Sequence, residues 1–165
     1  MRTISLLIAV LLGVLTFSVT CFAAQALTPQ KALVAKLYKN YAFEAIRDES
    51  DLDGEFLDRP RNVLLSYLTP SLAKLVLKDR KCAADTHEIC NLDFMPLWDS
   101  QDPTGAIVRI LPTSKNDEVN VQLRYGSETR TLTYFLTLTN LGWRIRDIAY
   151  ENGRKSLVDI LGRAK

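Results

Sequence analysis

The sequence of 165 residues contains a single histidine, His87. A nucleophile–base pair needs a base such as histidine, so this scarcity argues against hydrolase-type catalysis. The sequence also lacks the Gly-x-Ser-x-Gly, His-Glu-x-x-His and glycine-rich phosphate-loop motifs. A catalytic site would have to rely on Asp99, Asp102 and Asp147. We therefore expect no enzymatic activity, no catalytic residue, no metal and no cofactor.

The sequence lacks a large excess of either charge, with 21 Lys and Arg against 19 Asp and Glu. Nucleic-acid binding requires a basic stripe that neutralises phosphates, and the sequence has none. A lysine-rich amphipathic stretch that would lie on a membrane surface is also missing. We expect no nucleic-acid partner and no insertion into a membrane once the leader is removed.

The one long apolar run stands at the N-terminus, from Ile4 to Val19. Arg2 precedes it and small residues follow it, which is the order of a secretory signal peptide. We predict a signal peptide over residues 1–23, with cleavage as late as residue 26, and one domain over 27–165. A transmembrane anchor is the alternative, but the run is rather short for a span and lacks charged residues after it.

Cysteine is also scarce, and Cys21 falls in the leader, which leaves Cys82 and Cys90. In an oxidising compartment such a pair most simply forms a disulfide. A zinc site with His87 and Asp85 is the alternative, although the spacing matches no common zinc pattern.

Residues 48–58 form an acidic loop whose first carboxylates have the spacing of a calcium loop. Position twelve of that loop requires a bidentate glutamate, and Pro60 stands there instead. A solvated acidic loop is the favoured interpretation.

Helices are expected first along the chain. Thr28-Pro29 and Thr69-Pro70 are cap-and-proline start signals. Apolar residues at helical spacing predict helices over about 29–47, over about 62–68, and from Pro70 to a last turn near residues 78–81.

Strands dominate the second half. Apolar and polar residues alternate over 106–111, 119–125, 131–139 and 143–150, with turns between them. This pattern predicts a four-stranded antiparallel meander with one buried face. The third segment has apolar or β-branched residues on both faces, so we expect it to be central. Residues 157–161 predict a short closing helix, and the fold class is α+β.

Large apolar residues mix with acids over Leu92–Gly105. We expect Trp98 to anchor this loop to the core, with Asp99 and Asp102 binding turn amides. The alternative is that the loop forms the lip of a pocket.

Three stretches carry a resemblance to a known family: Tyr67–Leu72, Asp99–Asp102 and Gly142–Ile148. Together with the helix-then-meander order, they resemble a family of small exported bacterial proteins classed as a domain of unknown function. That family has the cystatin-like cone fold of the nuclear transport factor 2-like superfamily. The resemblance implies a bacterial periplasmic protein. Some proteins of this kind look like type VI secretion immunity proteins.

The fold alone does not give a function, and with catalysis disfavoured two binding classes stay open. A protein-binding module, most specifically an immunity-type inhibitor of a cell-wall hydrolase or similar toxin, is favoured, as a monomer or homodimer. Tentative contact residues are Asp99, Gln101, Asp102, Arg144 and Arg146, although the two arginines also suit a solvated strand face. The alternative is a small-ligand protein whose cone is lined by Trp98, Tyr134, Trp143 and Tyr150, which otherwise are ordinary core aromatics.

Overall fold

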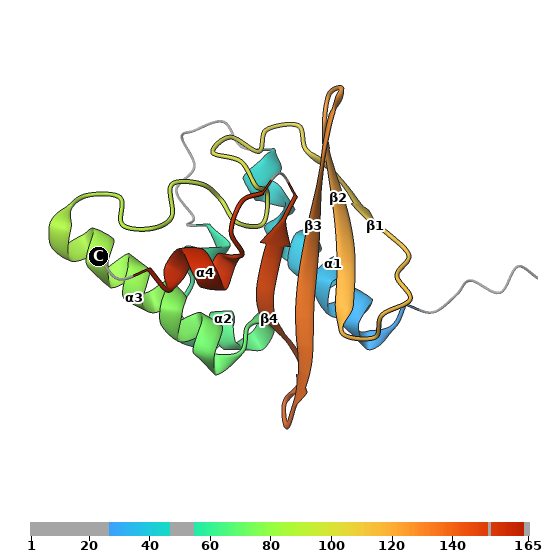
Figure 1. Cartoon of the computed structure of the whole chain (residues 1–165), viewed down its shortest axis with the longest axis horizontal. Coiled ribbons are helices and arrows are strands. Elements are labelled where there is room, and N and C mark those ends of the chain that lie inside the picture. Colours follow the sequence, from blue (N-terminus) through green and yellow to red (C-terminus); the bar gives the residue numbers. More distant parts are fainter. Residues whose placement is uncertain (1–26, 47–54, 152, 164–165) are drawn as a thin grey trace, which may run out of the picture.

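The computed structural model describes residues 27–46, 55–151 and 153–163. The predicted signal peptide and the first residues of the predicted acidic loop lie outside these residues. The second half of the chain forms one antiparallel sheet in the order β1-β2-β3-β4 (Figure 1). Its strands are β1 (Ile107–Ile110), β2 (Glu118–Tyr125), β3 (Glu128–Thr139) and β4 (Gly142–Tyr150). The predicted meander is confirmed, with β3 as an interior strand.

The helices precede the sheet, apart from a short one that closes the chain. They are α1 (Pro29–Tyr41) with the 3-10 turn η1 (Ala42–Ala45), the 3-10 turn η2 (Phe56–Asp58), α2 (Arg61–Tyr67), α3 (Pro70–Thr86) and α4 (Leu157–Leu161). Thr28 and Thr69 cap α1 and α3 as predicted, because each hydroxyl accepts a hydrogen bond from a first-turn amide. The predicted α+β class is therefore confirmed.

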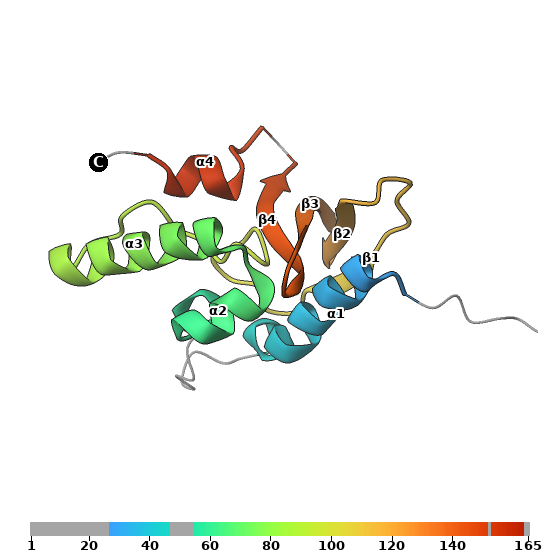
Figure 2. The same cartoon turned by 90° about the horizontal axis from the view of Figure 1, so that it is seen from below.

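The helices pack against one face and one edge of the sheet. Helix α1 lies across the inner face and contacts β1, β2 and β4, while α2, α3 and α4 gather beside β4 (Figure 2). The inward residues of β2, β3 and β4 alternate with residues of the open face, as a half-covered sheet requires. A single cluster of buried side chains therefore connects the helices to the sheet.

Helix α3 is longer than the sequence pattern indicated. The predicted end near residues 78–81 is wrong, because the helix continues to Thr86 and includes Cys82. It ends where His87 adopts the left-handed conformation, with φ of 56°. The cations at residues 78–81 therefore lie inside the helix, and its last turn holds no basic residue. His87 itself is exposed, as expected of a surface residue.

Candidate binding sites

The loop over residues 92–105 is held to the core through its backbone. Four successive carbonyl oxygens, those of residues 96 to 99, each accept a hydrogen bond from a side chain of α1 or the sheet. Tyr150 donates to the carbonyl of residue 96 and Tyr38 to that of residue 97. Tyr125 donates to the carbonyl of residue 98 and Arg130 to that of residue 99. These bonds satisfy backbone acceptors that are buried with the loop, so the loop is a rigid part of the fold.

Trp98 anchors this loop as predicted, and its partner is a buried carboxylate. The side chain is 1% exposed, and its Nε1–H donates to Oε2 of Glu44 at 2.6 Å. The other oxygen of Glu44 accepts a hydrogen bond from the amide of Phe56 at 2.7 Å. Burial raises the pKa of Glu44, although the hydrogen bonds from Trp98 and Phe56 partly oppose this. Sequence reasoning missed Glu44, since nothing local marks it as buried.

The raised pKa of Glu44 gives a testable pH dependence. Glu44 takes up its proton more readily in the folded protein than in the unfolded chain, so its ionisation lowers stability as pH rises through the raised pKa. We expect the free energy of unfolding of the wild type, minus that of Glu44→Gln, to fall as pH rises from below the ordinary carboxyl pKa. Urea unfolding at a series of pH values measures this difference.

Glu128 supplies a control with the opposite sign. Its hydrogen bond from Arg130 lowers its pKa, so its contribution is present at higher pH and is lost as pH falls. The wild type minus Glu128→Gln difference should therefore rise with pH. A Glu44→Gln difference that also rose with pH would contradict the assigned shift.

The aromatics that were candidates for a ligand cavity are mostly packed in the core. Tyr134 and Tyr150 are buried, and the Tyr134 hydroxyl lies 2.8 Å from that of Tyr38. Tyr38 also packs edge-on against Trp98, with ring centroids 5.4 Å apart. Burial raises the pKa of Tyr134 and of Tyr150, so both hydroxyls stay neutral donors. This arrangement matches ordinary core aromatics, and only Trp143 is partly exposed.

Two of the predicted contact residues of the loop, Asp99 and Asp102, lie in different surroundings. Asp99 is 5% exposed with φ of 47°, and its Oδ1 lies 3.4 Å from Nε of Arg154. Burial raises its pKa, while Arg154 and Arg130 oppose this. Asp102 is exposed and accepts a hydrogen bond from the amide of Thr104 at 2.9 Å, as expected of a turn carboxylate.

The two predicted arginines of β4 have different partners. Arg144 donates from Nε to the carbonyl of Leu65 in α2 at 2.8 Å, which ties the strand edge to that helix. Arg146 lies over the ring of Phe135 on the open face, with 5.2 Å between its guanidinium carbon and the ring centroid, and 3.7 Å from Asp117. The structure therefore does not bring the five predicted contact residues together in one patch.

A pocket opens beside α3, and we call it the α3 pocket. Its volume is about 460 Å³, and its walls come from α3, from the η2 region and from the segment over residues 89–96. Gln101, at its rim, donates to the carbonyl of Asp93 at 2.9 Å. Other residues of the loop, Gln101 and those over 92–96, line this pocket, while Trp98, Asp99 and Asp102, the aromatic and carboxylates expected at such a lip, do not.

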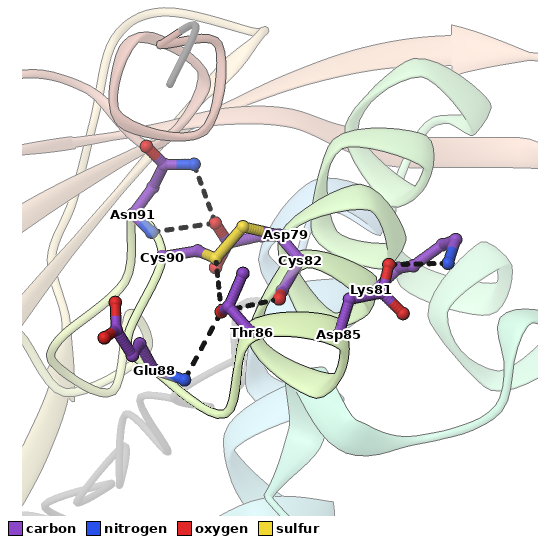
Figure 3. The surroundings of a disulfide bond; sticks show 8 residues. All are labelled: Asp79, Lys81, Cys82, Asp85, Thr86, Glu88, Cys90 and Asn91. Atoms are coloured by element: carbon purple, nitrogen blue, oxygen red, sulfur yellow. Dashed lines mark hydrogen bonds and ion pairs between the residues drawn. A yellow bond between two sulfur atoms is a disulfide. The ribbon is translucent and has the colours of Figure 1, made fainter.

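The predicted disulfide is present and joins two walls of this pocket. Cys82 of α3 is bonded to Cys90, with their Cα atoms 6.1 Å apart (Figure 3). Immediately after it, Asn91 donates from its amide and from Nδ2 to Oδ1 of Asp79, at 2.9 and 2.8 Å. Within the described residues no group of histidine, cysteine and acidic side chains is arranged for a metal. The cysteines therefore serve to fix the chain after α3 against that helix.

The turn between β3 and β4 presents a second candidate surface, the β3–β4 tip, made of Leu138, Leu141 and Trp143. Leu138 and Leu141 are 66% and 71% exposed. Leu138 continues the inward alternation of β3, but the hairpin extends beyond the helices there (Figure 1). Sequence reasoning missed this surface. The signal that was available is Leu141, a leucine inside a tight turn, where polar residues are usual.

No family model and no curated protein match the chain. Among solved structures, the phospholipid-binding protein from Ralstonia solanacearum in complex with a phospholipid aligns with a TM-score of 0.35 and 14% identity. The alignment covers 81% of this chain and 68% of that one. A similarity this low does not establish a shared fold, so nothing is carried over from that protein. Among the described residues, no helix is long and apolar enough to cross a membrane.

Proposed function

We propose that the chain is an exported, non-catalytic protein-binding module of the immunity type, acting in the bacterial periplasm on a toxin such as a cell-wall hydrolase. The observation that carries this proposal is the β3–β4 tip. Two leucines stand exposed there at the end of a hairpin that extends past the rest of the fold (Figure 1). An inhibitor that blocks an enzyme cleft needs a narrow, rigid element with apolar contacts at its end.

Hydrogen bonds within the turn hold the backbone of the tip. The Thr139 hydroxyl donates to the carbonyl of Gly142 at 2.7 Å and accepts from the amide of Leu141 at 3.2 Å. Gly142 has φ of 93°, a conformation that suits glycine and closes the turn. Leu138 pairs with Trp143 across the two strands. The backbone of the turn is therefore ordered before binding, which lowers the entropy lost on binding.

The disulfide supports the proposed location. Disulfides form and persist in compartments such as the periplasm and are rare in the reducing cytosol. Together with the signal peptide predicted over residues 1–23, the Cys82–Cys90 bond favours export. The near balance of Lys and Arg with Asp and Glu suits recognition by shape and apolar contacts more than by long-range charge.

The experiment is an inhibition and binding assay with the oxidised domain over residues 27–165. Periplasm-acting hydrolases encoded beside its gene are purified, and their peptidoglycan cleavage is measured with and without the domain. We expect one of them to be inhibited stoichiometrically. Failure of every such enzyme to bind the folded domain would overturn the proposal.

Leu141→Asp should weaken that complex at least tenfold, because a buried apolar contact is replaced by a charge that loses its water (roughly 1.4 kcal/mol or more). Ile46→Asp is the matched control, since Ile46 is also a strongly exposed apolar residue. Ile46 lies far from the tip. The carbonyl of the preceding residue, Ala45, accepts a hydrogen bond from the amide of Gly105, which precedes β1 at the end of the sheet opposite the β3–β4 turn. Equal loss of affinity in both variants would exclude the tip as the contact surface.

A further inference from the structure

The geometry of the α3 pocket points to a second binding site, one for a small organic cation with an apolar body, such as an alkyl or aromatic amine. This site is separate from the β3–β4 tip and does not depend on the proposed inhibitor role. Its volume of about 460 Å³ suits a small molecule, since ligand pockets commonly span about 300–1,000 Å³.

The lining combines an apolar wall with acidic groups. Most of its residues are apolar, which would bury the body of a ligand away from water. They are Leu57, Val76, Ala83, Ile89, Leu92, Phe94, Met95 and Pro96. The ionisable residues of the lining are four acids and one base: Glu55, Asp58, Asp79, Asp93 and Arg80. The excess of acids makes an anionic ligand unfavourable and a cation favourable.

The base in this lining is already engaged within the protein. Arg80 lies 3.7 Å from Asp58 and donates to the carbonyl of Arg59 at 2.9 Å. Its charge is therefore directed toward Asp58 and the chain near η2. Two other acidic groups of the lining, Asp79 in α3 and Asp93 in the segment after it, form no ion pair within the part of the chain that the structure describes.

Asp79 is the residue that gives the site its chemistry. It is only 8% exposed, and both of its hydrogen bonds, from the amide and Nδ2 of Asn91, go to Oδ1 (Figure 3). Among the described residues, Oδ2 has no protein donor, yet it is not among the polar atoms sealed from solvent. Because Oδ2 has no donor within the described part of the chain and is not sealed from solvent, it can accept a charge-assisted hydrogen bond from an ammonium group.

The wall segment that follows α3 is attached to the rest of the fold by a disulfide and by hydrogen bonds. The Cys82–Cys90 bond holds the start of the wall segment to α3, and the Asn91 contacts with Asp79 continue that attachment. At the other end, the Tyr150 hydroxyl donates to the carbonyl of Pro96 at 3.3 Å. A wall attached at both ends is preformed, so a ligand need not order it on binding.

The test compares three probes with the same six-carbon chain and different heads: hexylammonium, hexanol and hexanoate. Each is titrated into the oxidised, isotope-labelled domain, and amide shifts are followed by NMR. We expect hexylammonium to bind at least tenfold more tightly than hexanoate, with hexanol between them. The shifts should centre on α3 and on residues 89–96.

Two variants and a matched control locate the charge effect. Asp79→Asn keeps an acceptor for Asn91 while removing the carboxylate, and should weaken hexylammonium binding about tenfold, the cost of one lost charged hydrogen bond. Asp93 is exposed, so Asp93→Asn is the second variant in case Asp79→Asn fails to fold. It should also weaken hexylammonium binding. Asp85→Asn removes a carboxylate from the same helix outside the pocket, where Asp85 pairs with Lys81, and should change nothing.

Three results would overturn the proposal: equal binding of hexanoate and hexylammonium, shifts elsewhere on the domain, or no saturable binding by any probe. Leu141→Asp should bind hexylammonium as the wild type does. If the domain binds the cation and inhibits no hydrolase, the proposed cation site is supported and the inhibitor role fails. If it inhibits a hydrolase and does not bind the cation, the inhibitor role is supported and the cation site fails.

Discussion

Replacing Trp98 with alanine is expected to lower the free energy of unfolding by about 4 kcal/mol, the usual cost of removing a fully buried tryptophan. The indole is 1% exposed and packs edge-on against Tyr38. Its removal also deprives the buried carboxylate of Glu44 of one of its two donors. Urea unfolding at neutral pH, followed by far-ultraviolet circular dichroism under oxidising conditions, measures the change.

Trp143 provides the matched control, because it is the other tryptophan and is only partly buried. Trp143→Ala should cost no more than about 2 kcal/mol, since part of its surface already meets water. Trp98→Phe should fall between the two, as it keeps most of the ring and loses the hydrogen bond to Glu44. Equal losses for Trp98→Ala and Trp143→Ala would contradict the role of Trp98 as the anchor of the loop.

The double substitution Cys82→Ser with Cys90→Ser is expected to lower the free energy of unfolding by about 2–3 kcal/mol, from the loop entropy that a bond across so short a ring removes from the unfolded chain. The sequence separation of the two cysteines is 8. The bond closes one segment against α3 and leaves the sheet untouched, so we expect the variant to fold. Urea unfolding with and without reductant measures the effect.

Reductant supplies the control for this prediction. It should destabilise the wild type by about the same 2–3 kcal/mol and leave the double variant unchanged, because only the wild type has a bond to break. Thiol titration verifies that the wild type is fully reduced. If its free energy of unfolding is then unchanged, the bond contributes nothing to stability.

Local patterns were sufficient for much of the fold. The starts of α1 and α3 follow from Thr-Pro pairs, whose hydroxyls satisfy free amides without help from the rest of the chain. The four strands and the central place of β3 follow from side-chain alternation, which reports burial directly. The end of α3 did not follow, because the residues after Lys81 have no strong local stop signal before His87 takes the left-handed conformation.

The candidate sites were predicted less completely, for a physical reason. The disulfide and the anchoring role of Trp98 could be predicted, since two cysteines and one large aromatic have few alternatives in an oxidised, folded chain. Burial of Glu44 and Asp79, by contrast, depends on partners 54 and 12 residues away. Such contacts exist only once helices and sheet have packed together.

The sequence by itself determined the α+β class, the meander, the helix starts and the cysteine pairing, because each depends on periodicity, capping or pairing within a short stretch. Tertiary structure alone decided that Asp99 is buried, that Arg144 and Arg146 have separate partners, and that Leu138 and Leu141 are exposed. It also decided where the α3 pocket opens. These features depend on which surfaces are left uncovered when distant segments pack, and no local pattern records that.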